Sequence, residues 1–180
     1  LHTPRRRQRQ MCIRDRDDTA AQPKRWLYLL YDQLNLELNP WKKEPPESTG
    51  IILIESLSKG KSRPYHKQKL GLILANMRSF ALETQEKGHP VRYINTKSSY
   101  SEALEKLEIP LIHCVNPAEL STRKELDQLL VSGRLQQHPH TGWLTPREWF
   151  IQELGSNPPF RMDKFYSCLL YTSPSPRDGI

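Results

Sequence analysis

A long amphipathic stretch, Tyr65 to Gly88, constrains the fold of this chain more than any other feature. Its apolar side chains recur at the spacing of one helix face, and its charged side chains fall largely on the other side. This face consists of Leu70, Ile73, Leu74, Met77 and Ala81, and Phe80 widens it. Gly88 can adopt the left-handed conformation that ends a helix. One short apolar run, Gly50–Glu55, precedes the stretch and another, Val91–Asn95, follows it. This order predicts a right-handed strand, helix, strand unit with parallel strands.

The rest of the chain repeats this alternation. Further strands are predicted at Trp26–Tyr31, Ile109–Val115 and Leu135–His138, and further helices at 98–107, 122–131 and 145–154. Trp26–Tyr31 is an unbroken apolar and aromatic run, which is typical of a central parallel strand buried on both faces. Residues 35–49 are predicted to be a Pro-rich surface connection, with Trp41 folded back over the sheet. The sequence therefore predicts an α/β fold with a doubly wound, mostly parallel sheet of four to five strands.

The two ends of the chain follow no helix or strand pattern. RRQRQMCIRDR near the start and CLLYTSPSPRD near the end read as translations of sequencing-adapter DNA. We therefore expect residues 1–16 and 167–180 to be adapter sequence carried into the reading frame, and residues 17–24 to be a loose leader. The alternatives are a basic nucleic-acid-binding arm at the start and a disordered Ser/Pro-rich tail at the end.

Leaving out these ends changes the bulk properties of the chain. The net charge is +7 for all residues, and it is +2 without the six arginines and one aspartate of the first segment and the Arg177–Asp178 pair of the last. Composition then gives no argument for binding to nucleic acid or a membrane. Cys114 becomes the one remaining cysteine, which excludes a disulfide framework and fits a reducing, cytoplasmic location. No apolar run approaches about 18 residues and no signal peptide is recognisable, so no membrane span is expected.

No standard catalytic or nucleotide-binding motif is present, and no residue is predicted to be catalytic. The candidate site follows from the predicted topology instead. Asp32, Gln33 and Leu34 come after the first strand and Glu55 closes the second. Parallel pairing would bring them to one crevice at the carboxyl edge of the sheet, where ligands of such sheets bind. Carboxylates at this edge can bind polyol hydroxyls or ring N–H groups, and the alternative is that they cap helices.

Two other groups of polar residues allow more than one interpretation. His138 and His140 could bind a metal, but no third ligand is spaced to match, so a surface loop is favoured and no metal site is predicted. The cationic segment 57–64 is expected to be a loop that leads into the long helix. Its lysines and arginine could attract an anion to the start of that helix, or they could simply keep the loop solvated.

Four stretches of the sequence carry a family resemblance: DQL after the first strand, IES after the second, YHKQKLGLILANMRSFALETQEKGHPVRY around the long helix, and NPAELSTRKEL after the fourth strand. Together they resemble the deoxyribodipyrimidine photolyase-related proteins, which include the iron–sulfur bacterial cryptochromes and (6-4) photolyases. FRMDKFY resembles the segment by which that family enters its second, helical domain. The resemblance covers residues 25–166. It departs from the family at Tyr31, where Gly is common, and at Lys59, where some members have an acidic residue that contacts the antenna.

The resemblance implies a two-domain flavoprotein that uses blue light to repair ultraviolet photoproducts in DNA. Its α/β domain, here residues 25–155, would hold a ribityllumazine-type antenna chromophore, with Asp32, Gln33, Leu34 and Glu55 at the cofactor edge. FAD, a 4Fe–4S cluster and the DNA-binding cleft would belong to a missing helical domain, and residues 156–166 would begin the linker to it. This chain would then be a fragment whose partner is that domain, and it would bind little or no DNA itself.

Two other functions remain open. The parent protein could be a cryptochrome-type photoreceptor without repair activity, or the chain could be a stand-alone α/β ligand-binding module. A helical region with four cysteines beyond Tyr166 would favour the flavoprotein. If such a domain is missing, the face that packs against it would be exposed, and we expect Trp143, Trp149 and Phe160 near that face.

Overall fold

The structure is a computed structural model that describes residues 22–143, 145 and 147–172. Contacts within the chain divide the described residues into two units, one up to His140 and one from Thr141 onward. The first unit contains the whole sheet, and the second is helical. The sequence-based prediction extended the α/β domain to residue 155, whereas the contacts group residues after His140 with the C-terminal helix.

The first unit is built on a five-stranded, all-parallel sheet with the order β3-β2-β1-β4-β5. The strands are β1 (Arg25–Tyr28), β2 (Thr49–Ser56), β3 (Val91–Thr96), β4 (Ile112–Val115) and β5 (Leu135–His138). In the register of the central strand, Leu27 lies between Ile51 of β2 and His113 of β4. The doubly wound fold predicted from the sequence is confirmed, and Leu135–His138 is an edge strand as expected.

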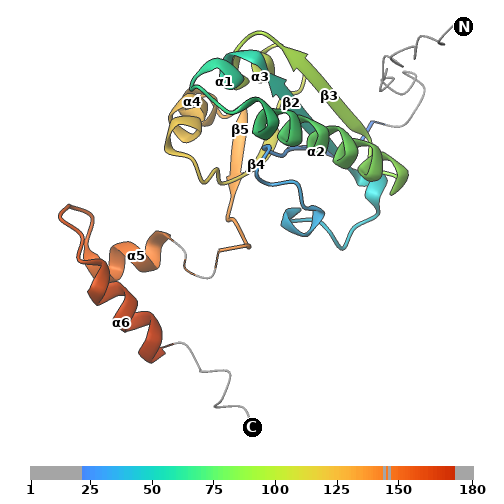
Figure 1. Ribbon diagram of the computed structural model, residues 1–180. Helices are drawn as coiled ribbons and strands as arrows, with labels where there is room; N and C mark the ends of the chain where they lie inside the picture. Colours follow the sequence, from blue (N-terminus) through green and yellow to red (C-terminus); the bar gives the residue numbers. More distant parts are fainter. Residues whose placement is uncertain (1–21, 144, 146, 173–180) are drawn as a thin grey trace, which may run out of the picture. The chain divides into compact units, whose positions relative to one another are not determined.

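Helices cover both faces of the sheet. In the first unit they are α1 (Leu57–Lys61), α2 (Lys67–Glu86), α3 (Tyr100–Glu105) and α4 (Leu120–Val131), and two 3-10 turns, η1 (Leu36–Leu38) and η2 (Pro46–Ser48), interrupt the connection between β1 and β2. Figure 1 shows α2 running alongside β2 and β3. Alternation of side chains along the strands supplies two cores. Leu27, Ile51 and Leu53 pack with Ala81 of α2 on one face. Tyr28, Ile52 and Ile54 pack with residues of α3 and α4 on the other.

The predicted long helix is confirmed as α2, and its C-terminal half makes the closest contact with the sheet. Met77, Ala81 and Thr84 are its buried residues. Gly88 has φ +93°, the left-handed conformation expected after its end. The next helix, α3, begins at a serine cap, because the Ser99 hydroxyl accepts a hydrogen bond from the backbone N–H of Glu102.

Several predicted boundaries were wrong, and the strand expected at Ile109–Val115 begins only at Ile112. The strand expected at Trp26–Tyr31 ends at Tyr28, and the following Leu29 makes one further bond, from its N–H to the carbonyl of Ile52. The loop expected at 57–64 begins with α1, because the hydroxyl of Ser56 caps the N–H of Lys59 at 3.1 Å. The C-terminal residues expected to fit no helix continue α6 (Met162–Thr172) beyond Tyr166.

Arg134, just before β5, anchors the end of α3 and should stabilise the first unit. Its guanidinium donates hydrogen bonds to the carbonyls of Glu105 (3.1 Å), Leu107 (2.8 Å) and Ile109 (3.4 Å). Replacing Arg134 with Met removes all three bonds, so the free energy of unfolding should fall by about 1–2 kcal/mol. Urea denaturation followed by tryptophan fluorescence would measure this, with Lys124→Met on the exposed side of α4 as the control. Equal unfolding midpoints for the two variants would contradict the assigned role.

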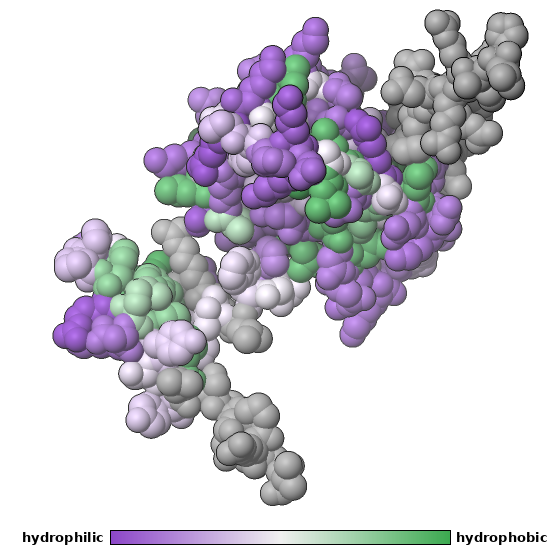
Figure 2. All heavy atoms as spheres, in the orientation of Figure 1, coloured by the Kyte–Doolittle hydropathy of each residue, from purple (hydrophilic) through white to green (hydrophobic). Residues whose placement is uncertain are grey.

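The second unit consists of α5 (Arg147–Leu154) and α6 and has its own aromatic contacts. The Phe150 ring lies 5.3 Å from that of Phe160 and 5.0 Å from that of Phe165, measured between centroids. Figure 2 shows hydrophobic residues on the surface of this unit. Trp143 and Phe160 are exposed, and Trp149 is half-buried. Within the part of the chain that the structure describes, no helix combines the length and apolar character needed to cross a membrane.

Candidate functional site

The carboxyl ends of β2, β1 and β4 lie side by side at one edge of the sheet. β2 and β3 extend the sheet on one side of β1, and β4 and β5 extend it on the other, so the winding reverses between β1 and β4. Ligands of open parallel sheets bind outside this edge, near such a reversal. Asp32 follows β1 and Glu55 lies near the end of β2, so the two predicted carboxylates share this edge.

A small cavity of about 90 Å³, partly open to solvent, lies at this edge beside the N-terminal half of α2. The apolar wall is formed by Leu70, Ile73, Leu74 and Met77 of α2 together with Ile54 of β2. The cavity exists because α2 approaches the sheet closely at its C-terminal half, whereas Leu70, Ile73 and Leu74 stay half-buried.

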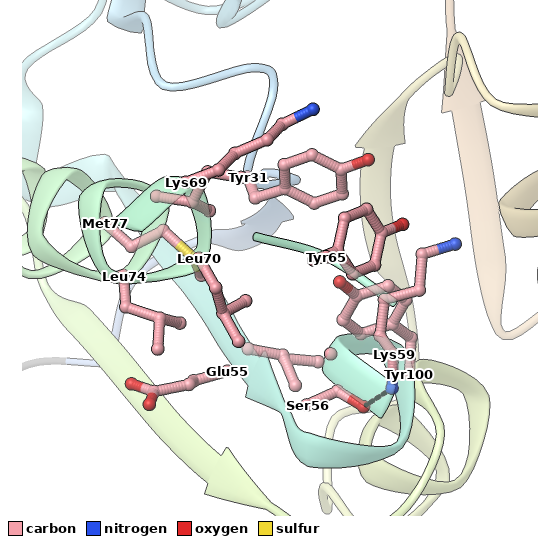
Figure 3. Close-up of a pocket in the computed structure, with 13 residues that line it drawn as sticks. Tyr31, Glu55, Ser56, Lys59, Tyr65, Lys69, Leu70, Leu74, Met77 and Tyr100 are labelled. Atoms are coloured by element: carbon pink, nitrogen blue, oxygen red, sulfur yellow. Dashed lines mark hydrogen bonds between the residues drawn. The ribbon is translucent and has the colours of Figure 1, made fainter. Parts of the chain in front are cut away.

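Three tyrosines form the other side of this cavity, and Figure 3 shows them opposite the apolar side chains of α2. Tyr31 lies in the turn after β1, Tyr65 precedes α2, and Tyr100 is the first residue of α3. Burial, reinforced by the carboxylate of Glu119, raises the pKa of Tyr31 to about 12. Burial also raises the pKa of Tyr100. Both phenols therefore stay neutral at physiological pH, where they can donate hydrogen bonds and stack on a planar ring.

A second, polar cavity of about 200 Å³ adjoins the first and shares Ser56 and Lys59 with it. Serine hydroxyls from four segments line it, together with two cations and two carboxylates. These residues include Ser58, Ser62, Ser99 and Ser121, with Arg63 and Glu125. Because the formal charges of Lys59 and Arg63 balance those of Glu119 and Glu125, this compartment suits a neutral, hydroxyl-bearing group.

Lys59 lies between the two cavities and is held in place there. Its Nζ is 2.6 Å from a carboxylate oxygen of Glu119, with only 14% of the lysine side chain and 24% of the glutamate side chain exposed. Nζ also donates to the hydroxyls of Ser121 and Thr122, each at 3.2 Å. The hydrogen bond from Lys59 is the main cause that lowers the pKa of Glu119 to about 2. Glu119 is therefore ionised at neutral pH. Lys59 is held in an ion pair, unlike the solvated loop cation that was one of the two interpretations of the sequence.

Glu55 is the one predicted cofactor-edge residue that lines the first cavity. Its carboxylate accepts hydrogen bonds from both Arg78 Nη2 (2.8 Å) and the Tyr93 hydroxyl (2.9 Å). Burial, followed by the bond to Glu55, raises the pKa of Tyr93 to about 12. Figure 3 shows this carboxylate on the side away from the three tyrosines. Glu55 therefore braces α2 against β3 while it forms part of the cavity wall.

The other three predicted residues lie at the same edge but do not line this cavity. Asp32 is exposed in the turn after β1, and partial burial raises the pKa of its carboxyl group. Gln33 is 1% exposed, and its amide nitrogen donates to the carbonyls of Val115 (3.4 Å) and Asn116 (3.1 Å). Leu34 packs against the core on the α2 face. Gln33 therefore joins the ends of β1 and β4, and Leu34 has a packing role.

His138 does not lie in a surface loop but in β5, where it pairs with a second histidine that the sequence did not suggest. His113 Nδ1 is 3.1 Å from His138 Nε2, and the Trp41 ring packs against both imidazoles. Trp41 is thus folded back over the sheet as predicted. Among the described residues there is no group of three or more metal-binding side chains. Cys114 is fully buried, and burial raises the pKa of its thiol to about 12, so it is inert as a nucleophile.

Sequence reasoning missed the roles of Tyr65 and Tyr100 and the partner of Lys59, and it singled out Tyr31 only as a departure from the family. Tyr31 and Tyr100 each adjoin a predicted strand end or helix start, which was a signal that could have placed them at the carboxyl edge. The apolar stripe of the long helix was interpreted as core along its whole length. Only the structure shows that its N-terminal part forms a cavity wall.

A family model described as deoxyribodipyrimidine photo-lyase-related protein matches this chain over residues 27–169. The matched range includes all the residues that line the two cavities. It agrees closely with the range 25–166 that the family resemblance covers. A search of curated proteins finds no significant match.

Proposed function

Because this chain belongs to the deoxyribodipyrimidine photo-lyase-related protein family, we propose that its α/β unit holds an antenna chromophore of the ribityllumazine type. When bound, such a group absorbs near-ultraviolet or blue light and passes the excitation on. The observation that carries the proposal is the pair of adjoining cavities at the carboxyl edge of the sheet. One is apolar and aromatic, and the other is lined by hydroxyls.

The first cavity would hold the ring system. Leu70, Ile73 and Leu74 supply an apolar wall, and the tyrosines opposite supply faces and hydroxyls for a planar heterocycle. Both Tyr31 and Tyr100 have a raised pKa and remain donors at neutral pH. Glu55 would lie closest to the ring among the predicted cofactor-edge residues, with Asp32, Gln33 and Leu34 supporting the edge from outside the cavity.

The second cavity would hold the ribityl chain. Its serine hydroxyls can exchange hydrogen bonds with a polyol. Its balanced formal charges favour a neutral tail over a phosphate, because the carboxylates of Glu119 and Glu125 would repel the phosphate. We therefore expect the chain to prefer a ribityl compound over the corresponding phosphate ester.

The parent protein, in this proposal, is a light-driven DNA repair flavoprotein related to the iron–sulfur bacterial cryptochromes and (6-4) photolyases. FAD, the 4Fe–4S cluster and the DNA would be bound by a helical domain beyond residue 166, and the location would be cytoplasmic. The α/β unit does not fit a four-cysteine cluster, because its Cys114 is buried and the described residues hold no group of three or more metal-binding side chains. The α/β unit itself would bind little DNA.

A photoreceptor without repair activity is the main alternative, since the same cavities would serve an antenna in either protein. Loss of ultraviolet photoproducts under blue light, measured on the complete parent protein, would decide for repair. We also propose that residues 1–16 and 167–180 derive from sequencing adapters. Sequencing the genomic DNA across the codon of Tyr166 tests this, because a different continuation must appear there.

The chromophore proposal predicts that the 180-residue chain takes up ribityllumazine, and that filling the cavity prevents this. Leu74→Trp places an indole in the cavity wall and should weaken binding at least tenfold. Leu72→Trp is the matched control, since Leu72 lies on the same helix but is 62% exposed and does not line the cavity. Fluorescence titration with ribityllumazine measures both affinities.

Two outcomes would overturn the proposal. One is a wild-type chain that shows no fluorescence change and retains no near-ultraviolet-absorbing compound when ribityllumazine is offered. The other is equal affinity in the Leu74→Trp and Leu72→Trp variants, which would place the ligand elsewhere.

A further inference from the structure

We infer that residues 57–66, which comprise α1 and the loop before α2, form a lid over the two cavities, and that the Lys59–Glu119 ion pair is the latch that holds it closed. This inference rests on the proposed function for its ligand but not for its structural test. The lid segment contributes Lys59, Gly60 and Tyr65 to the wall of the first cavity. It contributes Ser58, Lys59, Ser62 and Arg63 to the second.

The α1 part of the lid segment has little apolar attachment to the rest of the unit, and Tyr65 near its other end is half-buried. None of the residues of α1 is buried, and the side chain of Leu57, its one large apolar residue, is 45% exposed. At its start, the Ser56 hydroxyl donates to the carbonyl of Ser98 at 2.7 Å and accepts from the N–H of Lys59. This cap fixes the first turn of α1 but does not hold the loop that follows.

The attachment at the far side is electrostatic. Both cations that join the lid segment to another element contact Glu119, Lys59 at 2.6 Å and Arg63 at 3.9 Å. Glu119 precedes α4, so the contact spans from the end of β2 to the loop after β4 and passes over the end of β1 between them. Lys59 adds hydrogen bonds to Ser121 and Thr122. Lys59 therefore makes most of the polar contacts that hold the lid segment closed.

Opening of the Lys59–Glu119 latch would connect the two cavities, and the shape of the joined site indicates the class of ligand. With the latch closed, Lys59 stands between the aromatic and the hydroxyl-lined compartments. With it open, the compartments join into one elongated site that admits a ligand with a planar ring and a neutral polyol tail. The latch should therefore set the rate at which such a ligand enters and leaves, more than its affinity.

Amide hydrogen exchange of the ligand-free, 180-residue chain tests the lid directly. Lys59→Met and Glu119→Gln should each speed exchange at least tenfold in residues 57–66 and leave residues 77–86 of α2 unchanged. The charge reversal Lys59→Glu with Glu119→Lys should restore exchange to near the wild-type rate. Lys42→Met is the matched control, because it breaks an exposed ion pair of the same 2.6 Å length, with Glu37, away from the site.

Exchange in residues 57–66 within twofold of wild type in both single variants would overturn the lid. An equal rise in residues 77–86 would also overturn it, since the pair would then support the whole fold. With ribityllumazine bound, Lys59→Met should release the ligand about tenfold faster in a stopped-flow measurement. A wild-type chain that never binds ribityllumazine would refute the chromophore proposal, whereas the exchange result would still decide on the lid.

Discussion

Replacing Gly50 with alanine is expected to destabilise the first unit by roughly 1–3 kcal/mol, as overpacking of a filled core does. Gly50 of β2 pairs with Trp26 of β1, and an added Cβ would lie 2.5–2.9 Å from three carbons of the indole ring. The ring passes over Gly50 and reaches β3, where the guanidinium of Arg92 is 4.6 Å from its centroid. Trp26 is only 7% exposed, so the ring has little room to yield.

The same substitution at Gly71 is the matched control and should act in the opposite direction. Gly71 lies within α2, and no atom lies within 4 Å of the position that a Cβ would occupy. Alanine there should stabilise the chain by roughly 0.5–1 kcal/mol, because glycine is the poorer helix former. Urea denaturation of both variants measures the difference. An unfolding midpoint for Gly50→Ala at or above that of wild type would refute the close contact with Trp26.

Acid is expected to destabilise the first unit through His113. Its side chain is 9% exposed, beside Trp41 and His138. Burial first, then His138 and Arg25, lower the pKa of His113 to about 4. An unfolded histidine has a pKa of about 6.5 and takes up its proton first as the pH falls. Between these values the unfolded state binds more protons, so the free energy of unfolding should fall by roughly 2–3 kcal/mol from pH 6.5 to pH 4.

The variant His113→Gln separates this effect from other acid-sensitive groups. Glutamine keeps a hydrogen-bonding group beside His138 but does not titrate, so the stability loss between pH 6.5 and pH 4 should shrink by most of that amount. Glu119, with its folded pKa of about 2, begins to lose its stabilising contribution as the pH falls through the unfolded glutamate pKa of about 4.3, but wild type and His113→Gln share this loss, so it cancels in the comparison. Denaturation curves at several pH values measure the slope. Parallel slopes for wild type and His113→Gln would show that His113 is not the responsible group.

Much of the fold could be predicted because its signals are local. The 3.6-residue stripe of α2, the left-handed glycine after it and the Ser99 cap of α3 each depend on residues within a few positions of one another. The order of strands and helices then left few topologies open. The ends of the elements were harder to predict. After Tyr28 the side chains of the chain remain buried, but regular pairing of β1 with its neighbouring strands stops.

The candidate site was predictable only as an edge of the sheet. The predicted topology placed Asp32 and Glu55 at one edge of the sheet. The wall of the cavity depends on the distance between α2 and the sheet, and the periodicity of apolar residues in the sequence does not give that distance. Glu55 lines the cavity, whereas Gln33 turns away to bind the carbonyls of Val115 and Asn116. Two residues near the ends of neighbouring strands can therefore differ in role.

The sequence by itself determined the alternation of parallel strands and crossover helices, and with it the edge at which a ligand would bind. Only the tertiary structure decided which side chains meet there: Lys59 with Glu119, His113 with His138, and the indole of Trp26 over Gly50. The physical reason is that periodicity and caps act within a turn or two of the chain. Side-chain contacts between residues tens of positions apart depend on the packing of whole elements against one another.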